Sequence, residues 1–183
     1  LGPALGLALV VGRLRPADPG NEASRVTPSH RGEVLASSPP ASRTAQGAEV
    51  VSRAFTLLDE PQTQAEGRAL LEGAAADGSP AACFSLGRLI LRGHRGYEKD
   101  PERALALLRR AGAQGHGDAL VLLGRMYEKG EGVGQDEVEA LLWYRAATAA
   151  GSARGYAGVG VLLRRDRPQE AREWLERGVA QGN

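Results

Sequence analysis

The sequence has few of the residues that build most catalytic or cross-linked sites. Of its 183 residues one is cysteine and three are histidine, and aromatic residues make up 4%. The single Cys83 excludes an internal disulfide framework and a cysteine-built zinc site, and its apolar helical surroundings predict a small core residue. His30, His94 and His116 are far apart, with no cysteine or carboxylate at ligand spacing around them. We therefore predict no metal site and no other cofactor.

The chain also lacks a large excess of charge of either sign. Its formal net charge is +1 at pH 7, which does not favour nucleic acid as the main partner. It contains no P-loop, no dinucleotide-binding glycine fingerprint and no nucleophile elbow. No stretch alternates polar and apolar residues for long enough to predict a sheet. The sequence therefore predicts an all-α protein that is not an enzyme.

Prolines divide the chain into two parts. Six of the ten lie before residue 44, at positions 3, 16, 19, 28, 39 and 40. No helical period survives that spacing. The remaining four, Pro61, Pro80, Pro101 and Pro168, each stand where a helix could begin, and proline at a first helical position loses no hydrogen bond. We predict an extended arm over residues 1–44 and a helical domain over residues 45–183.

The helical part is a tandem repeat. The segment ALALLRRAGAQG at residues 104–115 recurs as ALLWYRAATAAG at residues 140–151, and glycines at 78, 115, 151 and 182 mark the period. Periods in this range are typical of stacked helix pairs, each of which buries its apolar face against its neighbours. The predicted units span about 45–78, 79–115, 116–151 and 152–183.

Each unit is predicted to contain two helices. Their expected ranges are 44–58 with 62–76, 80–91 with 101–114, 118–129 with 137–150, and 153–164 with 168–181. Asp100 before Pro101 is predicted to cap one helix, and Asp136 followed by Glu139 has the spacing of a capping box.

The third unit carries a resemblance to a known family. Residues 119–151, with their LGRMY, GEGVG and ALLWYRAA segments, resemble a Sel-one-like repeat, a branch of the tetratricopeptide superfamily. The second unit is similar to it, the fourth keeps Ala171 and Trp174, and the first keeps little. The resemblance implies a right-handed α/α solenoid of about four helix pairs, and a role in holding proteins together.

The motif residues have a structural interpretation. Small residues at Gly87, Gly124 and Gly160 are expected to let paired helices approach closely. Aromatic residues at helical spacing are usually core residues, so we expect Trp143, Tyr144 and Trp174 to fill the space between helices.

Arginines indicate where a partner could bind. Arg88, Arg92 and Arg125 occupy the first helices of their units, and we expect them to line the inner face of the curve and to meet an acidic partner. The alternative is a solvated face, as most charge runs are. Val179 lies on the last helix, after which no polar capping helix follows in this sequence, so we expect a partner or a further repeat to cover it.

Two classes of function agree with these features. The first is a scaffold that serves as an accessory subunit of a large complex, a mitochondrial membrane complex in particular, with other protein subunits as partners. The second is a freestanding bacterial or periplasmic adaptor tethered at its N-terminus. Residues 1–11 are apolar and suggest membrane proximity, although they fall short of the roughly 20 residues that span a bilayer. The arginine-bearing, serine-rich arm favours the mitochondrial alternative.

Overall fold

The computed structural model describes residues 41–182, and these form helices with no strand. The eight helices are α1 (Ala41–Asp59), α2 (Gln64–Ala76), α3 (Pro80–Arg92), α4 (Pro101–Ala113), α5 (Gly117–Lys129), α6 (Glu137–Ala149), α7 (Ala153–Leu163) and α8 (Pro168–Ala180). Residues 1–40, which include most of the predicted arm, its apolar residues 1–11 and His30, lie outside the described part.

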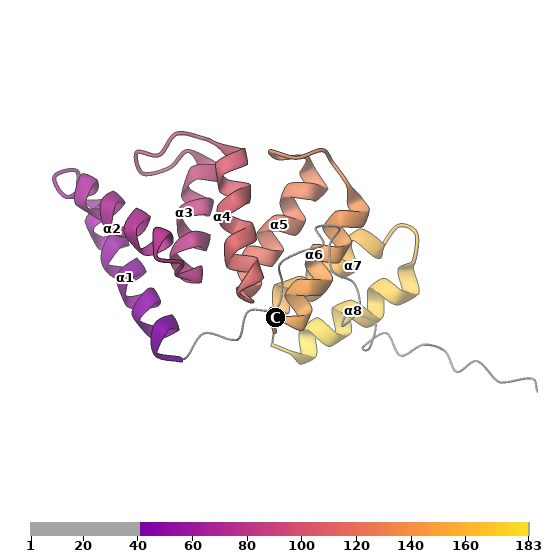
Figure 1. The fold of residues 1–183 in the computed structure, drawn as a ribbon. Coiled ribbons are helices and arrows are strands. Elements are labelled where there is room, and N and C mark those ends of the chain that lie inside the picture. Colours follow the sequence, from indigo (N-terminus) through magenta and orange to yellow (C-terminus); the bar gives the residue numbers. More distant parts are fainter. Residues whose placement is uncertain (1–40, 183) are drawn as a thin grey trace, which may run out of the picture.

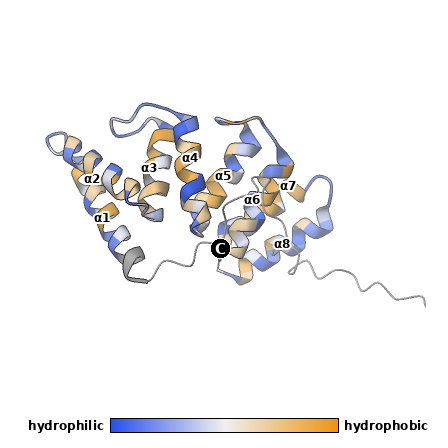
Figure 2. Cartoon of the chain, in the orientation of Figure 1, coloured by the Kyte–Doolittle hydropathy of each residue, from blue (hydrophilic) through white to orange (hydrophobic). Residues whose placement is uncertain are grey.

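The helices form four antiparallel pairs that follow one another in an arc from α1–α2 to α7–α8 (Figure 1). Each pair also contacts the next, because the second helix of one unit packs on the first helix of the following unit. Apolar residues are concentrated along the helices, while hydrophilic residues gather in the connections (Figure 2). The predicted all-α solenoid of helix pairs is confirmed.

The odd-numbered helices line the inner side of the curve. Within the described chain, α1 packs directly on α3 and α5 on α7, whereas no two even-numbered helices pack closely on one another. In a curved row of helix pairs, the helices on the inner side of the curve lie closer to one another than the helices on the outer side do. The face of an odd-numbered helix that is turned away from all its neighbours is therefore the concave surface of the solenoid.

Helix boundaries differ from the predicted ones by a few residues. Helix α1 begins at Ala41, three residues before the predicted start and inside the predicted arm. Helix α2 begins two residues late, at Gln64, because Thr63 takes the N-cap position and its hydroxyl donates to the Leu57 carbonyl at 2.8 Å. Helix α7 has 11 residues against 13 in α3 and α5, so the last unit is shortened partly within the helix itself.

The core runs through all four pairs in two clusters, one centred on α3 to α5 and one between α6, α7 and α8. Its largest fully buried side chains are Leu71, Ile90, Leu108, Leu123, Met126, Val159 and Cys83. The Cys83 thiol donates to the Ala75 carbonyl at 3.5 Å, and burial raises its pKa. Cys83 is thus a core residue, as the sequence predicts.

Candidate protein-interaction surfaces

Glycines set the distance between the two helices of a pair. A Cβ atom at Gly87 would lie 3.1 Å from Leu108 Cγ, and one at Gly124 would lie 2.8 Å from the ring of Tyr144. At Gly160 it would lie 2.6 Å from Leu175 Cγ. These distances are shorter than an ordinary van der Waals contact, so the helices touch where the side chain is missing.

Aspartates begin the second helices of the middle units. The Asp100 carboxylate accepts from the Arg103 amide at 2.9 Å, and Asp136 accepts from the amides of Val138 and Glu139 at 2.9 and 3.0 Å. Each side chain satisfies amides that have no partner within the helix. The Asp136 amide itself donates to the Tyr127 carbonyl at 2.9 Å. This hydrogen bond connects the end of the glycine-rich loop at residues 130–134 to α5.

The three motif aromatic residues are buried to different extents. Tyr144 is 3% exposed and Trp174 is 5% exposed, while Trp143 is only partly buried and stacks on Tyr127 at 6.4 Å between ring centroids. The Tyr144 hydroxyl donates to Glu128 at 2.6 Å. Burial, and then this hydrogen bond, raise the pKa of Tyr144 above its usual range. The side chain of Tyr144 is therefore held in a fixed position between α5 and α6.

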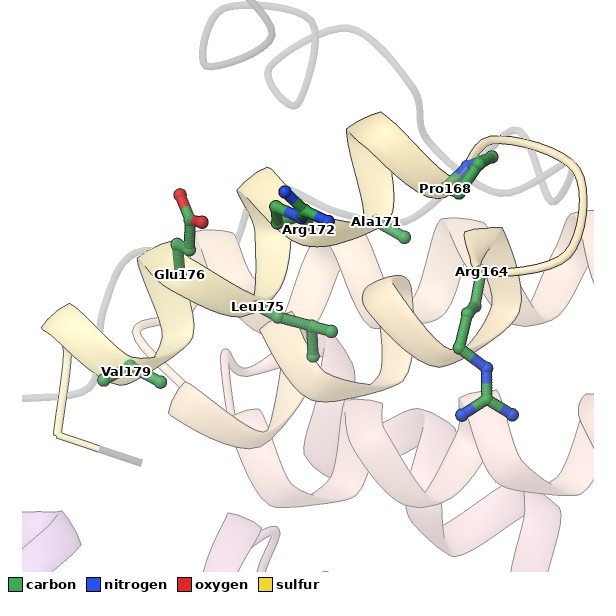
Figure 3. Close-up of a pocket in the computed structure, with 7 residues that line it drawn as sticks. All are labelled: Arg164, Pro168, Ala171, Arg172, Leu175, Glu176 and Val179. Atoms are coloured by element: carbon green, nitrogen blue, oxygen red, sulfur yellow. The ribbon is translucent and has the colours of Figure 1, made fainter.

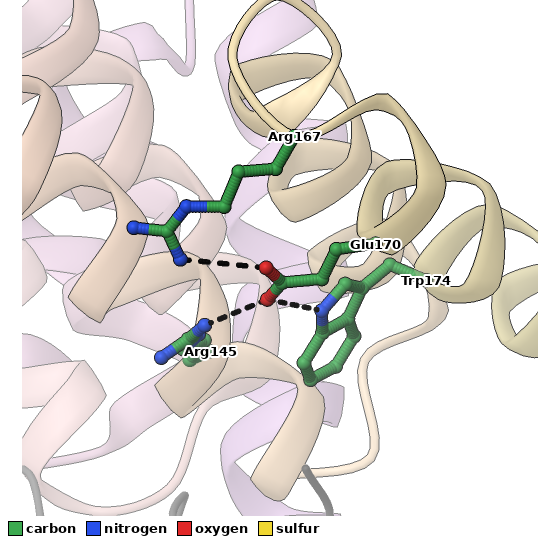
Figure 4. A network of polar contacts seen from close by, with 4 residues as sticks. All are labelled: Arg145, Arg167, Glu170 and Trp174. Atoms are coloured by element: carbon green, nitrogen blue, oxygen red, sulfur yellow. Dashed lines mark hydrogen bonds and ion pairs between the residues drawn. The ribbon is translucent and has the colours of Figure 1, made fainter.

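Trp174 belongs to a polar network that joins the last two units (Figure 4). The Glu170 carboxylate accepts from Arg145 at 3.2 Å, from Arg167 at 3.3 Å and from the Trp174 indole at 3.4 Å. Arg145 comes from α6, so the network fixes α8 against the preceding unit. The polar groups of these side chains are therefore used in contacts within the fold.

The arginines predicted to bind a partner lie on the odd-numbered helices α3 and α5. Arg92 and Arg125 are exposed, and Arg88 is half-buried on the face of α3 that lies over α1. Lys129 follows Arg125 by one helical turn, as Arg92 follows Arg88. We name these four residues the cationic stripe: Arg88, Arg92, Arg125 and Lys129. None of them forms an ion pair with another residue of the described chain.

Arg88 is held more firmly than the others. Its guanidinium lies 5.5 Å from the ring centroid of Phe84 and 6.0 Å from that of Phe55. Phe84 in turn stacks on His116 at 4.6 Å. Cation–π contacts fix the side chain without neutralising its charge, so Arg88 presents a positioned cation between the first two units.

Sequence reasoning missed Lys129 as a member of the stripe, although the repeat itself gives the signal. Counting from the motif glycines Gly87 and Gly124, the residues one and five positions later are Arg88 and Arg92 in the second unit and Arg125 and Lys129 in the third. In the fourth unit the same positions hold Val161 and Arg165. Comparing units in register therefore identifies the stripe better than counting charges along the chain.

The acids around the glycine loop of the third unit have mostly structural roles. Asp136 is the N-cap of α6, and Glu128 accepts from Tyr144. Glu137 and Glu139 lie in the first turn of α6, where the helix dipole favours negative charge. Most of these acids therefore stabilise the start of α6 or its contact with α5.

Val179 lies on an apolar surface at the last pair. We name this the end face: Pro168, Leu175 and Val179 of α8. Val179 is 71% exposed and Leu175 is 39% exposed, whereas Ala171 beneath them is buried in the core at 2%. A shallow groove of about 410 Å³ runs along α8 beside Leu175 and Val179, with Arg164, Arg172 and Glu176 also lining it (Figure 3).

The histidines of the described chain do not come together. His94 is exposed in a loop, whereas the Nδ1 atom of His116 accepts from the Ala119 amide at 3.3 Å and so caps α5. Burial lowers the pKa of His116. Within residues 41–182 no three histidine, cysteine or carboxylate side chains are grouped so that they could hold a metal ion. No described helix is long and apolar enough to cross a membrane.

Comparisons with known proteins agree with this architecture. Two solved structures are similar to the chain, each with 26% sequence identity over 75% of it. One is a Sel1 repeat protein from Oxalobacter formigenes, with a TM-score of 0.65, and the other is c5321, a protective antigen of uropathogenic Escherichia coli strains with an SLR fold, with a TM-score of 0.64. The chain spans 59% of the first and 31% of the second. No curated protein matches it in sequence.

The family model of the Sel1 repeat matches residues 80–116, 117–152 and 155–183, which correspond to the pairs α3–α4, α5–α6 and α7–α8. The pair α1–α2 precedes the matched units. Repeats of this kind generally mediate contacts between proteins. Because the matches cover more than half of the chain, this protein belongs to the Sel1 repeat family.

Proposed function

We propose that the chain is a non-catalytic scaffold whose concave surface binds an acidic segment of a partner protein. The observation that carries this proposal is the cationic stripe: four basic residues in register on two consecutive units, with no ion pair to any described residue. Unpaired cations that share one face raise the local concentration of acidic ligands and accelerate their association.

The spacing of the stripe favours an extended peptide over a compact site. Helices that pack side by side have axes roughly 8–10 Å apart. Since only α4 lies between α3 and α5 in the chain, the axes of these two helices are separated by at most about twice that distance. An extended chain advances about 3.3 Å per residue. Acidic residues a few positions apart in one segment could therefore reach both units.

A direct test uses an oligoglutamate peptide as the probe. We expect it to bind with an affinity that falls as salt is raised, and to bind markedly less well to Arg92→Glu and Arg125→Glu. Arg53→Glu is the matched control, because Arg53 is exposed on α1 and outside the stripe. Equal loss of binding in the control would show that net charge and not the stripe is responsible, and unchanged binding in all variants would refute the proposal.

At the level of the cell, we propose that the chain is an accessory subunit of a large complex, a mitochondrial membrane complex in particular. The resemblance of the arm to a transit region supports this choice. The second candidate is a bacterial or periplasmic adaptor, which the two bacterial structures favour. Purification from the source cells under native conditions separates the two: stoichiometric recovery in one large complex supports the subunit, and recovery of the chain outside any such complex supports the adaptor.

A further inference from the structure

The second and third units contact each other less closely through their first helices than the other neighbouring units do. Helix α1 packs on α3, and α5 packs on α7, but α3 and α5 do not pack closely on one another. A regular repeat would place the same contact between every two consecutive units. A feature of the sequence that is particular to the second and third units therefore separates α3 from α5.

Small residues allow the first helices of the other units to approach each other. A Cβ atom at Gly47 of α1 would lie 2.5 Å from the Oγ atom of Ser79, which is the N-cap residue of α3. A Cβ atom at Gly117 of α5 would lie 2.8 Å from the Cβ atom of Ser152, which is the N-cap residue of α7. In both places a glycine of one unit meets the N-cap serine of the next, so the backbones come close together.

Two aromatic rings occupy the corresponding place between the second and third units. The N-cap residue of α5 is His116, where α3 and α7 have serine. The His116 ring stacks on the ring of Phe84 from α3, with 4.6 Å between the ring centroids and 27° between the ring planes. We name these two residues the aromatic spacer: Phe84 and His116. Two stacked rings need more room than a glycine and a serine, so the spacer accounts for the separation of α3 from α5.

The aromatic spacer lies directly beside the cationic stripe. The guanidinium of Arg88 lies 5.5 Å from the centroid of the Phe84 ring, so this ring contacts both a cation of the stripe and the ring of His116. Half of the stripe belongs to α3 and the other half to α5. The separation of these two helices therefore sets the distance between the two halves of the stripe.

We propose that the aromatic spacer determines which acidic segments the stripe prefers, because it holds the two halves of the stripe apart. This inference rests on the proposed binding of acidic segments and adds the spacing that such a segment needs. Directly packed helices have axes roughly 8–10 Å apart, and α3 and α5 are separated by more than this and by at most about twice as much. At about 3.3 Å per residue, this range corresponds to roughly three to six residues of an extended chain. The preferred segment carries acidic residues at two positions that far apart.

A series of synthetic peptides tests the preference. Each peptide carries two pairs of glutamates joined by a neutral spacer, and only the length of the spacer changes. We expect the wild-type chain to bind most tightly when the pairs are roughly three to six residues apart. His116→Ser gives α5 the N-cap residue of α3 and α7 and leaves Phe84 in place beside Arg88. This variant should prefer shorter spacers, of roughly two to three residues.

Two further variants make the rank order of the peptides the deciding result. Phe84→Val combined with His116→Ser gives the second and third units the residues that the next pair of units has at these positions, Val121 and Ser152. It should show the same shift toward shorter spacers, even if the release of Arg88 lowers every affinity. Phe84→Tyr keeps a ring against His116 and is the matched control, which should retain the wild-type rank order.

The separation of α3 from α5 can be measured independently of binding. Spin labels on cysteines introduced at the exposed residues Arg92 and Lys129 report the distance between the ends of the two helices. Cys83 is buried, so it should not take up a label. We expect the distance between the labels to decrease by a few ångströms when His116→Ser is added, and to stay the same when Phe84→Tyr is added. Helical circular dichroism checks that all variants fold.

The possible results separate this inference from the proposed function. An unchanged label distance in both His116→Ser and the double variant would show that the rings do not hold the helices apart. A shorter distance with an unchanged rank order of peptides would show that the spacing does not select the partner. Either result overturns the role of the spacer while the binding of acidic segments stands. If the wild-type chain binds neither oligoglutamate nor any peptide of the series, the proposed function is wrong and the role of the spacer is wrong with it.

Discussion

Replacing Gly124 with alanine tests whether the close approach of α5 and α6 limits the stability of the solenoid. In an ordinary helix this change is stabilising by about 1 kcal/mol, because alanine has the higher helix propensity. Here the added Cβ would lie 2.8 Å from two ring atoms of Tyr144. Something must move, and overpacking of this kind costs about 1–3 kcal/mol.

The ring of Tyr144 has little room to move away. Its hydroxyl is held by Glu128 at 2.6 Å, and the ring lies so close to Gly158 of the next unit that a Cβ there would also clash with it. We therefore expect the cost to be borne by the backbone of α5. Subtracting the propensity gain from the overpacking cost leaves a net loss of about 0–2 kcal/mol in the free energy of unfolding.

Gly73→Ala is the matched control. Gly73 lies within α2, is exposed, and has no atom within 4 Å of the position of an added Cβ. The Gly73→Ala variant should gain the full stabilisation of about 1 kcal/mol from the higher helix propensity of alanine. The difference in the free energy of unfolding between the two variants therefore isolates the cost of overpacking, at about 1–3 kcal/mol. For a chain of this size that difference corresponds to roughly 2–12 °C in the melting midpoint measured by circular dichroism.

A double-mutant cycle identifies the clashing partner. Tyr144→Leu places the residue of the equivalent positions 108 and 175 opposite the glycine, and Gly124→Ala should cost less in that background, with a coupling of about 1 kcal/mol or more. If Gly124→Ala stabilises the wild-type chain as much as Gly73→Ala does, the close approach is not under strain and the reasoning is wrong.

Three further predictions concern other parts of the fold. Burial lowers the pKa of His116 below its ordinary value of 6.5, and the neutral ring caps α5 through Nδ1. At mildly acidic pH the unfolded chain therefore binds more protons than the folded chain does. The free energy of unfolding should consequently fall as the pH is lowered through about 6.5. Denaturant titrations should show this slope flatten in His116→Asn but persist in His94→Gln, and an unchanged slope in the first variant would contradict it. Glu170→Ala removes the acceptor of three donors and should cost about 1–3 kcal/mol, against a small effect for the exposed Glu173→Ala; equal melting midpoints would show that the network adds no stability. Deleting residues 1–40, which precede α1, should leave the helical signal and its melting nearly unchanged, whereas loss of the fold would mean that the repeats need the arm.

The sequence predicts the helices well because the signals that begin and end them are local. Pro80 and Pro101 at first helical positions, Asp100 and Asp136 as N-caps, and glycines with positive φ after α3 and α5 all act within one turn. The start of α1 was missed because neither Ala41 nor Ser42 carries a comparable signal in the sequence.

Surface roles are harder to predict because they depend on neighbours far away in the chain. Arg88 is an ordinary charged residue in the sequence, and its position over Phe55 follows only once α3 packs on α1. Trp143 and Trp174 occupy the same position of their units, yet one is half-buried and the other is 5% exposed. Trp174 differs because Arg145 and Tyr156 from the preceding elements pack on it, a contact that no local pattern encodes.

The position of the cationic stripe follows from the helix period. Gly87, Gly124 and Gly160 must face the second helix of their own pair, so the residue that follows each of them is turned by about 100° toward the concave side. The fold fixes the orientation of this position but not its chemistry, which is arginine at 88 and 125 and valine at 161. At this position the second and third units are therefore cationic and the fourth is apolar, although the position four residues later keeps a basic residue in all three units, at Arg92, Lys129 and Arg165. A partner that follows the stripe beyond the third unit would therefore meet an apolar side chain at Val161 before it reaches Arg165.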